Sequence, residues 1–322
     1  MLTDLCNFLK QPLMISEPFR DQLRLLAKDG TSADVKNLFF DAPCPVMAVE
    51  RQVAALSQGA SKQKSVLVIP IRGVISQHGS WWTDMMGGCS IDSLNRALDM
   101  ALNEDRVGSV LFDHHTPGGA PFGVKEFADR VFAARSEKLM VSVSNSLMCS
   151  AGCWTGSAAD RVFVSPMSQN ASVGVFSMLT DETGALELEG IKVKICRIPE
   201  GKAEGHPYEP LTPTVIDNEM AAITSIYNEF TSSLAKYRGV SVQKVKDDFG
   251  SGRCLDAKSA VSAGLADRVA SFDQVLAMMQ AGSVRRQSSG ASAVADVEER
   301  KLDSRDPEQL RRQMAIAEAT SL

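Results

Sequence analysis

The stretch VGSVLFDHHTPGGAPFGVKEFADRVFAARSEKLMVSVSNS, residues 107–146, contains two short apolar runs separated by an amphipathic segment. The runs VGSVLFD and LMVSVSNS have the length and the apolar content of buried strands. The segment between them, VKEFADRVFAARS, spaces its apolar residues like one face of a helix. The stretch therefore predicts a βαβ unit within a largely buried sheet.

The same alternation continues on both sides of this unit. The further strand-like runs are SVLVIPIRGVI, DRVFVSP, SVGVFSML, VKICRI and LADRVAS. Helical patterns lie between or after them, at SIDSLNRALDMALNED, over about Pro213–Tyr237 and over Phe272–Gln280. The pattern predicts an α/β fold.

Composition shifts divide the chain into four parts. Residues 1–62 form an N-terminal accessory segment with short helical patterns, and residues 63–281 form the α/β domain. Residues 282–305 are rich in Ser, Arg and Asp without apolar periodicity, which is typical of a flexible linker. Residues 306–322 begin with a helix start signal and predict a short C-terminal helix.

Charge and cysteine usage exclude several functional classes. The chain of 322 residues is 44% hydrophobic and has a formal net charge of −5, which argues against nucleic acid as the main partner. It has no apolar run long enough to span a membrane and no secretory signal pattern. Its seven cysteines are scattered, as in a protein with reduced thiols, so we expect a cytoplasmic location. We expect no cofactor, because neither GxxxxGK[ST] nor GxGxxG occurs.

The first candidate site is HHTPGGAP, residues 114–121, directly after a predicted strand. Gly118 and Gly119 lack Cβ atoms, so the backbone can turn there and direct N–H groups into open space. Ligands of α/β sheets bind at such strand ends. The alternative is an ordinary strand-to-helix turn.

The second candidate is MCSAGCW, residues 148–154, between a predicted strand and a short predicted helix of small residues. Ser150 lies at that junction, where a nucleophilic hydroxyl would have backbone N–H groups beside it for an oxyanion. Ser150 could equally be a plain N-cap. The two flanking cysteines lack the further nearby ligands that zinc needs, so we expect no metal.

The third candidate is the Gly/Pro-rich loop IPEGKAEGHPYEPL, residues 198–211, which contains Lys202. A desolvated lysine can act as the general base for a serine nucleophile. The alternatives are an ordinary surface lysine, or a histidine base: His115 precedes the Gly-Gly turn, and His206 shares the loop with Lys202.

Taken in order, these motifs resemble peptidase family S49, the signal peptide peptidase A type, from about Ser65 to Gln280. TPGG resembles the S/T-P-G-G turn of that family, and CSAGCW its A-S-G-G-Y segment. EGKAEGHPYEPL resembles its lysine loop, and GRCLDAKSAVSAGLADRV its closing segment. NASVGV, residues 170–175, resembles the strand whose serine, here Ser172, hydrogen-bonds the lysine.

The resemblance implies a ClpP/crotonase-like fold of repeated ββα/βαβ units and a Ser-Lys dyad of Ser150 and Lys202. It implies that Ser172 orients the lysine. Gly118, Gly119 and Ala151 are the implied oxyanion-hole residues. No metal and no cofactor are implied.

Within the family, the motifs are most similar to phage capsid maturation proteases of the lambda C type. That likeness implies a homo-oligomeric ring in the host cytoplasm, inside the procapsid, whose substrates are scaffold, portal or capsid proteins and its own chain. A prophage or bacterial signal-peptide-peptidase-like protease acting on other peptides is an alternative. A crotonase-like acyl-CoA enzyme and a non-catalytic ring-forming assembly protein are two more. His115, the pair Asn170-Ala171 and the pair Cys153-Trp154 depart from the family pattern, which affects the shape of the substrate pocket.

Overall fold

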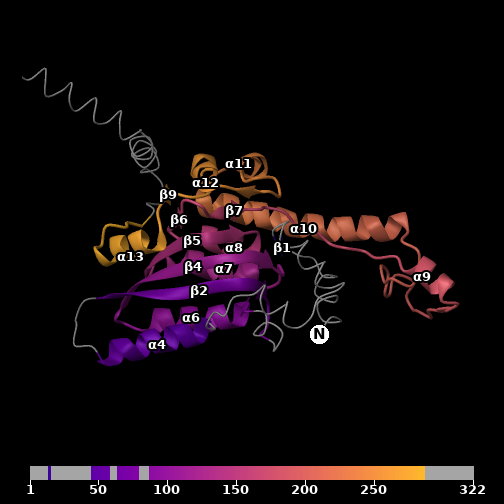
Figure 1. Cartoon of the computed structure of the whole chain (residues 1–322), viewed down its shortest axis with the longest axis horizontal. Helices are drawn as coiled ribbons and strands as arrows, with labels where there is room; N and C mark the ends of the chain where they lie inside the picture. The colour runs from indigo at the N-terminus through magenta and orange to yellow at the C-terminus, as the bar shows by residue number, and fades with distance from the viewer. Residues whose placement is uncertain (1–13, 16–44, 59–63, 80–86, 287–322) are drawn as a thin grey trace, which may run out of the picture. The chain divides into compact units, whose positions relative to one another are not determined.

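The computed structural model describes residues 14–15, 45–58, 64–79 and 87–286 (Figure 1). The described residues up to Arg285 belong to one compact unit. The helical patterns expected in residues 16–44 and 306–322 lie outside the described residues. The domain boundaries at 62 and 281 therefore stay predictions.

A largely parallel sheet forms the centre of this unit. Its main path runs β3-β2-β4-β5-β6-β9, and every neighbouring pair on it is parallel. The strands are β2 (Ser65–Ser76), β3 (Cys89–Ser90), β4 (Val107–Gly119), β5 (Leu139–Cys149), β6 (Arg161–Val164) and β9 (Arg268–Val269). The predicted α/β class is confirmed.

Three short strands lie off this path, all near the carboxyl ends of β4 and β5. They are β1 (Met14–Ile15), antiparallel to β4, β7 (Gln169–Ala171), parallel to β5, and β8 (Cys254–Leu255), antiparallel to β7. The TPGG motif, expected as a turn, instead continues β4 through Gly119. The reason is pairing: β2 follows β4 up to Ile75 and Gly119.

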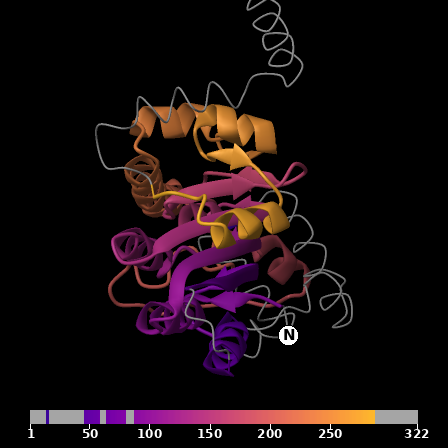
Figure 2. The same cartoon turned by 90° about the vertical axis from the view of Figure 1, so that its left-hand side faces the viewer.

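Helices cover both faces of the sheet. On one face lie α6 (Ile91–Asn103), α7 (Val124–Ala134) and α8 (Ala151–Ser157), whose buried residues form one apolar cluster with β2 and β4. On the other face lies α13 (Phe272–Gln280), drawn in yellow in Figure 2. It buries Val275 and Met279 in a cluster with Leu111 and Val143. Two short helices, α11 (Val242–Asp248) and α12 (Ala257–Ala263), add buried residues to the same apolar cluster. None of the helices among the described residues is long and apolar enough to cross a membrane.

The helix α4 (Pro45–Gln58) covers an edge of the sheet at β2. The side chain of Gln52 accepts a hydrogen bond from the Val68 N–H at 2.8 Å and donates one to the Val68 carbonyl at 2.7 Å. An amide side chain thus takes the place of a neighbouring strand, and pairing with another chain at this position is blocked.

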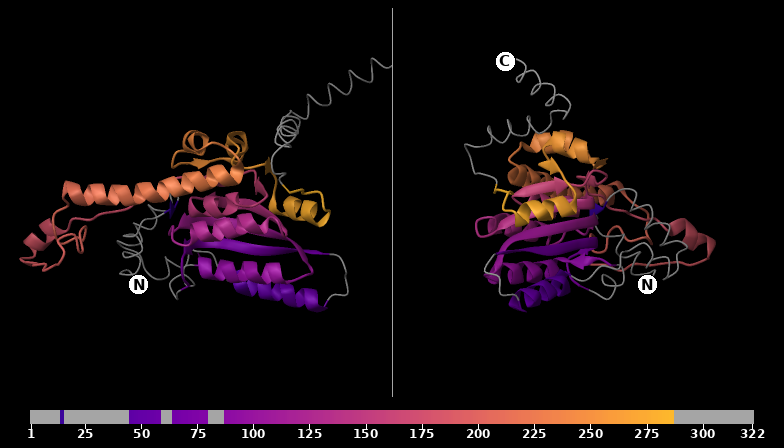
Figure 3. Two further views of the ribbon diagram at one scale, coloured as in Figure 1. Left: turned by 180° about the vertical axis from the view of Figure 1, so that it is seen from behind. Right: turned by 60° about the vertical axis from the view of Figure 1, so that its left-hand side comes forward.

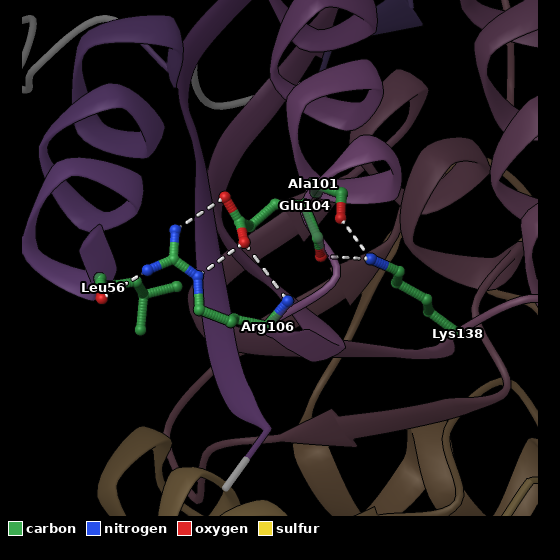
Figure 4. Close-up of polar contacts among 5 residues, drawn as sticks. All are labelled: Leu56, Ala101, Glu104, Arg106 and Lys138. Atoms are coloured by element: carbon green, nitrogen blue, oxygen red, sulfur yellow. Dashed lines mark hydrogen bonds and ion pairs between the residues drawn. The ribbon is translucent and has the colours of Figure 1, made fainter. Parts of the chain in front are cut away.

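A cluster of charged side chains joins α4 to the loop between α6 and β4 (Figure 4). Arg106 donates to the carbonyl of Leu56 at 2.6 Å and forms a two-point ion pair with Glu104. Lys138 donates to the carbonyls of Ala101 and Glu104, both at 2.8 Å. The hydrogen bonds from Arg106 lower the pKa of Glu104 to about 2, so the Glu104 carboxylate stays ionised in its pair with Arg106 at neutral pH.

Residues 176–229, here called the arm, extend from the sheet layers (Figure 3). The arm contains α9 (Thr183–Leu188) and the first part of α10 (Pro213–Arg238), and α10 is buried only from Phe230 onward. The predictions of strands at SVGVFSML and VKICRI are wrong, because neither segment forms a strand. SVGVFSML has a single bridge residue, Phe176, and VKICRI lies in an exposed part of the arm without strand residues.

Candidate active site

Ser150 occupies a sharp turn between β5 and α8. Its backbone has φ 55° and ψ −115°, outside the helical and strand regions, and its N–H donates to the Ala171 carbonyl at 2.6 Å. Its hydroxyl is buried and has no hydrogen-bond partner among the described residues. The plain N-cap interpretation is therefore wrong, because the side chain makes no capping hydrogen bond. Strained turns of this kind present nucleophiles at the start of a helix.

Small residues after Ser150 let α8 approach β4 and β5 closely. A Cβ atom on Gly152 would lie 2.3 Å from Thr116 Cγ2, and one on Gly156 would lie 2.4 Å from Met148 Sδ. The described side chains leave no room for a larger residue at either position. The glycines of this helix are thus required by packing, and they fix the distance between Ser150 and β4.

The two glycines at the end of β4 play different parts. The Gly118 N–H donates to Thr116 Oγ1 at 3.1 Å, and that hydroxyl donates to the Gly73 carbonyl at 2.6 Å. Gly118 has φ 106°, which favours glycine. A Cβ on Gly119 would lie 1.9 Å from the Ile75 carbonyl oxygen. Thr116 thus holds the loop in shape, a role that the sequence analysis missed although TPGG contains the residue.

Ser172 lies next to the residue that receives the Ser150 N–H. Its hydroxyl donates to the Gly252 carbonyl at 3.2 Å, and its N–H donates to the Arg253 carbonyl at 3.0 Å. Ser172 of the NASVGV motif therefore contacts the closing motif GRCLDAKSAVSAGLADRV, which contains Gly252 and Arg253. Within a single chain, the Ser172 hydroxyl bonds the Gly252 carbonyl and does not bond Lys202.

Lys202 lies in an exposed turn of the arm. Its N–H donates to the Pro199 carbonyl at 3.0 Å, and the Ser150 hydroxyl has no partner, so the two proposed dyad members do not contact each other within one chain. A hydrogen bond joins Ser150 to Ala171, the residue before Ser172, and Gly152 of α8 packs against Thr116 of the TPGG motif. Lys202 makes no hydrogen bond with the Ser150 hydroxyl.

None of the histidines considered as a base contacts Ser150. The ring of His115 contacts the Ser146 hydroxyl, and burial together with the nearby Arg72 charge lowers the pKa of His115 to about 4. His206 lies in the arm, where its Nδ1 accepts the Tyr208 N–H at 3.0 Å. A neutral His115 held by another serine does not suit the role of a base for Ser150.

The cysteines around the turn are packed as thiols. Cys149 Sγ lies 3.4 Å from Cys254 Sγ, and this contact together with burial raises the pKa of Cys149. Burial raises the pKa of Cys153 to about 12. Protonated thiols are poor metal ligands, and the described residues contain no group of three His, Cys, Asp or Glu that could hold a metal ion.

Comparisons with known proteins show which proteins this chain is similar to. The chain is 28% identical over 222 residues to the capsid assembly protease C of Escherichia phage lambda, covering 69% of this chain and 50% of that protein. It is 24% identical over 259 residues to the head-tail preconnector protein GP5 of Enterobacteria phage P21, covering 80% of this chain and 51% of that protein. The chain thus spans about half the length of these curated relatives.

Among solved structures, a ClpP1 mutant from Listeria monocytogenes is similar, with a TM-score of 0.41 and 14% identity, over 65% of this chain and 94% of that one. The model of peptidase family S49 matches residues 132–285, the segment that contains Ser150, Ser172 and Lys202. This segment of the chain is thus similar to members of peptidase family S49.

Proposed function

We propose that this chain is a serine endopeptidase with Ser150 as the nucleophile and Lys202 as the general base. The observation that carries the proposal is the geometry of Ser150, a strained residue with a buried, unpartnered hydroxyl at the start of α8. In this proposal the N–H groups come from Gly119, the last residue of β4, and from Ala151, the first residue of α8. Such N–H groups suit an oxyanion, and each is worth roughly 3 to 4 kcal/mol of transition-state stabilisation.

The proposed reaction forms and then hydrolyses an acyl-enzyme. Neutral Lys202 takes the proton of the Ser150 hydroxyl as its oxygen attacks the scissile carbonyl. The N–H groups of Gly119 and Ala151 stabilise the oxyanion, and Lys202 returns the proton to the leaving amine as the C–N bond breaks. Water then attacks the ester by the same route and frees the serine. Gly118 contributes through the shape of the loop, since its N–H is bonded to Thr116.

In this proposal the base comes from a second copy of the chain in a ring. Lys202 is exposed on the arm, whereas the Ser150 hydroxyl is buried and without a partner. The arm also exposes apolar side chains, with Leu188 at 92% and Ile198 at 95% exposure. An apolar surface of this kind is typical of a protein interface. Covering it with a neighbouring copy would also desolvate Lys202, as its role as a base requires.

The substrates proposed are proteins of a phage head, including scaffold, portal or capsid proteins, and the chain itself. The support is the likeness to a capsid assembly protease and a head-tail preconnector protein. A prophage or bacterial protease with other peptide substrates is the alternative. Either would bind an extended substrate as an added strand, because the site lies at the end of a sheet.

The test is to co-express the chain with head proteins encoded beside it and to measure truncation by mass spectrometry. Ser150→Ala and Lys202→Ala should each abolish cutting, whereas Lys192→Ala, an exposed lysine change on the same arm, should not. Mixing the two inactive variants should restore part of the cutting if the dyad forms between copies. If one of these two variants still cuts, the dyad is refuted. If mixing the two variants restores no cutting, the formation of the dyad between two copies is refuted.

The pH dependence gives a separate test of the lysine base. Because only a neutral lysine accepts the serine proton, kcat/KM should rise with pH when chemistry limits the rate. A flat profile between about pH 6 and pH 9 would argue against a lysine in this role.

A further inference from the structure

The short strand β1 lies directly beside the glycines of the candidate site. Met14 pairs with Gly119 and Ile15 with Gly118, in antiparallel register. On their other side the same glycines pair with Val74 and Ile75 of β2. Since a strand residue has only two neighbours in a sheet, β1 must lie on the side of β4 that faces β5.

The side of β4 beyond Thr116 is open because β5 no longer pairs with β4 there. Pairing between β4 and β5 ends at Thr116 and Met148, two residues before Ser150. The next residue, Cys149, pairs with Ala171 of β7. The backbone of β4 beyond Thr116 therefore has a free edge next to the nucleophile, and among the described residues β1 covers it.

A peptide substrate needs this same edge. Its scissile carbonyl must lie near Ser150 and the Gly119 N–H, and extended peptides bind by adding a strand to an exposed sheet edge. We propose that residues 14–15 occupy the backbone position of the substrate, so that the N-terminal segment competes with substrates within its own chain. This inference rests on the proposed peptidase function and adds its regulation.

The proposed competition acts through backbone pairing between β1 and β4. A tethered segment acts at an effective concentration that reaches the millimolar range for short linkers, so even weak pairing competes with a free peptide. The apparent Kd of a substrate then increases by the inverse of the fraction of chains whose edge is free. Removing the pairing should restore the intrinsic affinity.

The experiment measures binding, without catalysis, in the full chain carrying Ser150→Ala. The probe is a fluorescent synthetic peptide with the chain's own residues 9–22, LKQPLMISEPFRDQ, followed by fluorescence anisotropy. Met14→Pro/Ile15→Pro removes both N–H donors of β1. Met14→Ala/Ile15→Ala is the matched control, because it keeps the backbone donors. The proline variant should bind the peptide at least about 10-fold more tightly than the parent, and the alanine variant should bind like the parent.

Three outcomes would overturn the proposal: equal binding by the proline variant and the parent, no binding by the proline variant, or an equal gain in the alanine variant. A thermal unfolding curve for each variant shows that it is folded. Peptide hydrolysis with Ser150 intact separates this inference from the function on which it rests. Cleavage with the same KM in the parent and the proline variant refutes the competition alone. Tighter binding by the proline variant with no cleavage of any peptide refutes the peptidase function and supports the position of β1.

Discussion

The close contact between α8 and β4 predicts a specific effect of adding one methyl group after the nucleophile. In Gly152→Ala, the new Cβ would lie 2.3 Å from Thr116 Cγ2, whereas carbon atoms in contact lie about 3.5 to 4.0 Å apart. The methyl group of Thr116 cannot rotate away freely, because Thr116 Oγ1 is bonded to both Gly73 and Gly118. The helix must therefore move by more than about 1 Å relative to β4.

The magnitude follows from two opposing terms. Overpacking a buried contact costs about 1 to 3 kcal/mol, and this contact is at the severe end. Replacing glycine by alanine within a helix returns up to about 1 kcal/mol. We expect a net loss of about 2 kcal/mol, equivalent to a decrease in Tm of roughly 4 to 8 °C for a unit of this size. Displacing Ser150 by about 1 Å should also decrease kcat/KM by about 100-fold.

A second substitution tests the cause. Thr116→Ser removes Cγ2 and keeps the hydroxyl, so Thr116→Ser/Gly152→Ala should recover about 1 to 2 kcal/mol in a double-mutant cycle of chemical unfolding. Gly184→Ala is the matched control, because nothing lies within 4 Å of its added Cβ. It lies in α9, so it should leave the free energy of unfolding unchanged or increase it by up to about 1 kcal/mol. A loss in Gly152→Ala that the Thr116 change does not reduce would refute the steric explanation.

Two further predictions concern the anchoring of α10. Phe230 stacks on Trp154 of α8, with ring centroids 4.7 Å apart and an interplanar angle of 15°. Phe230→Ala should therefore decrease the free energy of unfolding by about 3 to 5 kcal/mol. A loss below about 1 kcal/mol in chemical unfolding would contradict the packing described. Burial opposes ionisation of Asp129, but hydrogen bonds from Lys236 and Tyr237 of α10 and from a lysine of its own helix hold its pKa at about 2. This carboxylate therefore stabilises the fold above its ordinary pKa of 3.8, and the contribution is lost as the pH falls through about 2. Asp129→Asn should remove that part of the acid sensitivity. If the free energies of unfolding of the parent and of Asp129→Asn differ by the same amount from pH 6 down to about pH 2, the assignment is contradicted.

The strands and helices of the sheet layers were predictable because their signals are local. The apolar runs at β2, β4 and β5 are long enough to identify buried strands, and the helix expected over Pro213–Tyr237 is found at Pro213–Arg238. The strands expected in the arm failed for a reason that sequence cannot supply. The residues of VKICRI favour a strand, but a strand also needs a partner, and the described chain provides none there.

The site shows the same division. Ser150 and the two glycines were candidates because they are small residues at strand ends, but the residues alone left an N-cap and an ordinary turn open. The resemblance to family S49 is what gave them their expected roles. The place of Lys202 was not predictable, because it depends on how the arm folds relative to the sheet. The role of Thr116 was also hidden, since a threonine before Pro-Gly-Gly does not reveal that its hydroxyl bonds two backbone groups and its methyl packs on Gly152.

The helix α10 connects the two halves of the proposed dyad. Its buried end stacks on α8, the helix that begins with Ser150, while its exposed end leads back to the turn that contains Lys202. If the base acts on a neighbouring copy, α10 determines where each copy presents its lysine relative to its own nucleophile. Loosening the buried end through Phe230→Ala should then disturb Ser150 and the contact between copies together. Lys202→Ala should leave the reaction of Ser150 with a small, strongly electrophilic serine probe measurable, because the turn at Ser150 is held by β5, α8 and the Ala171 carbonyl and needs nothing from the arm.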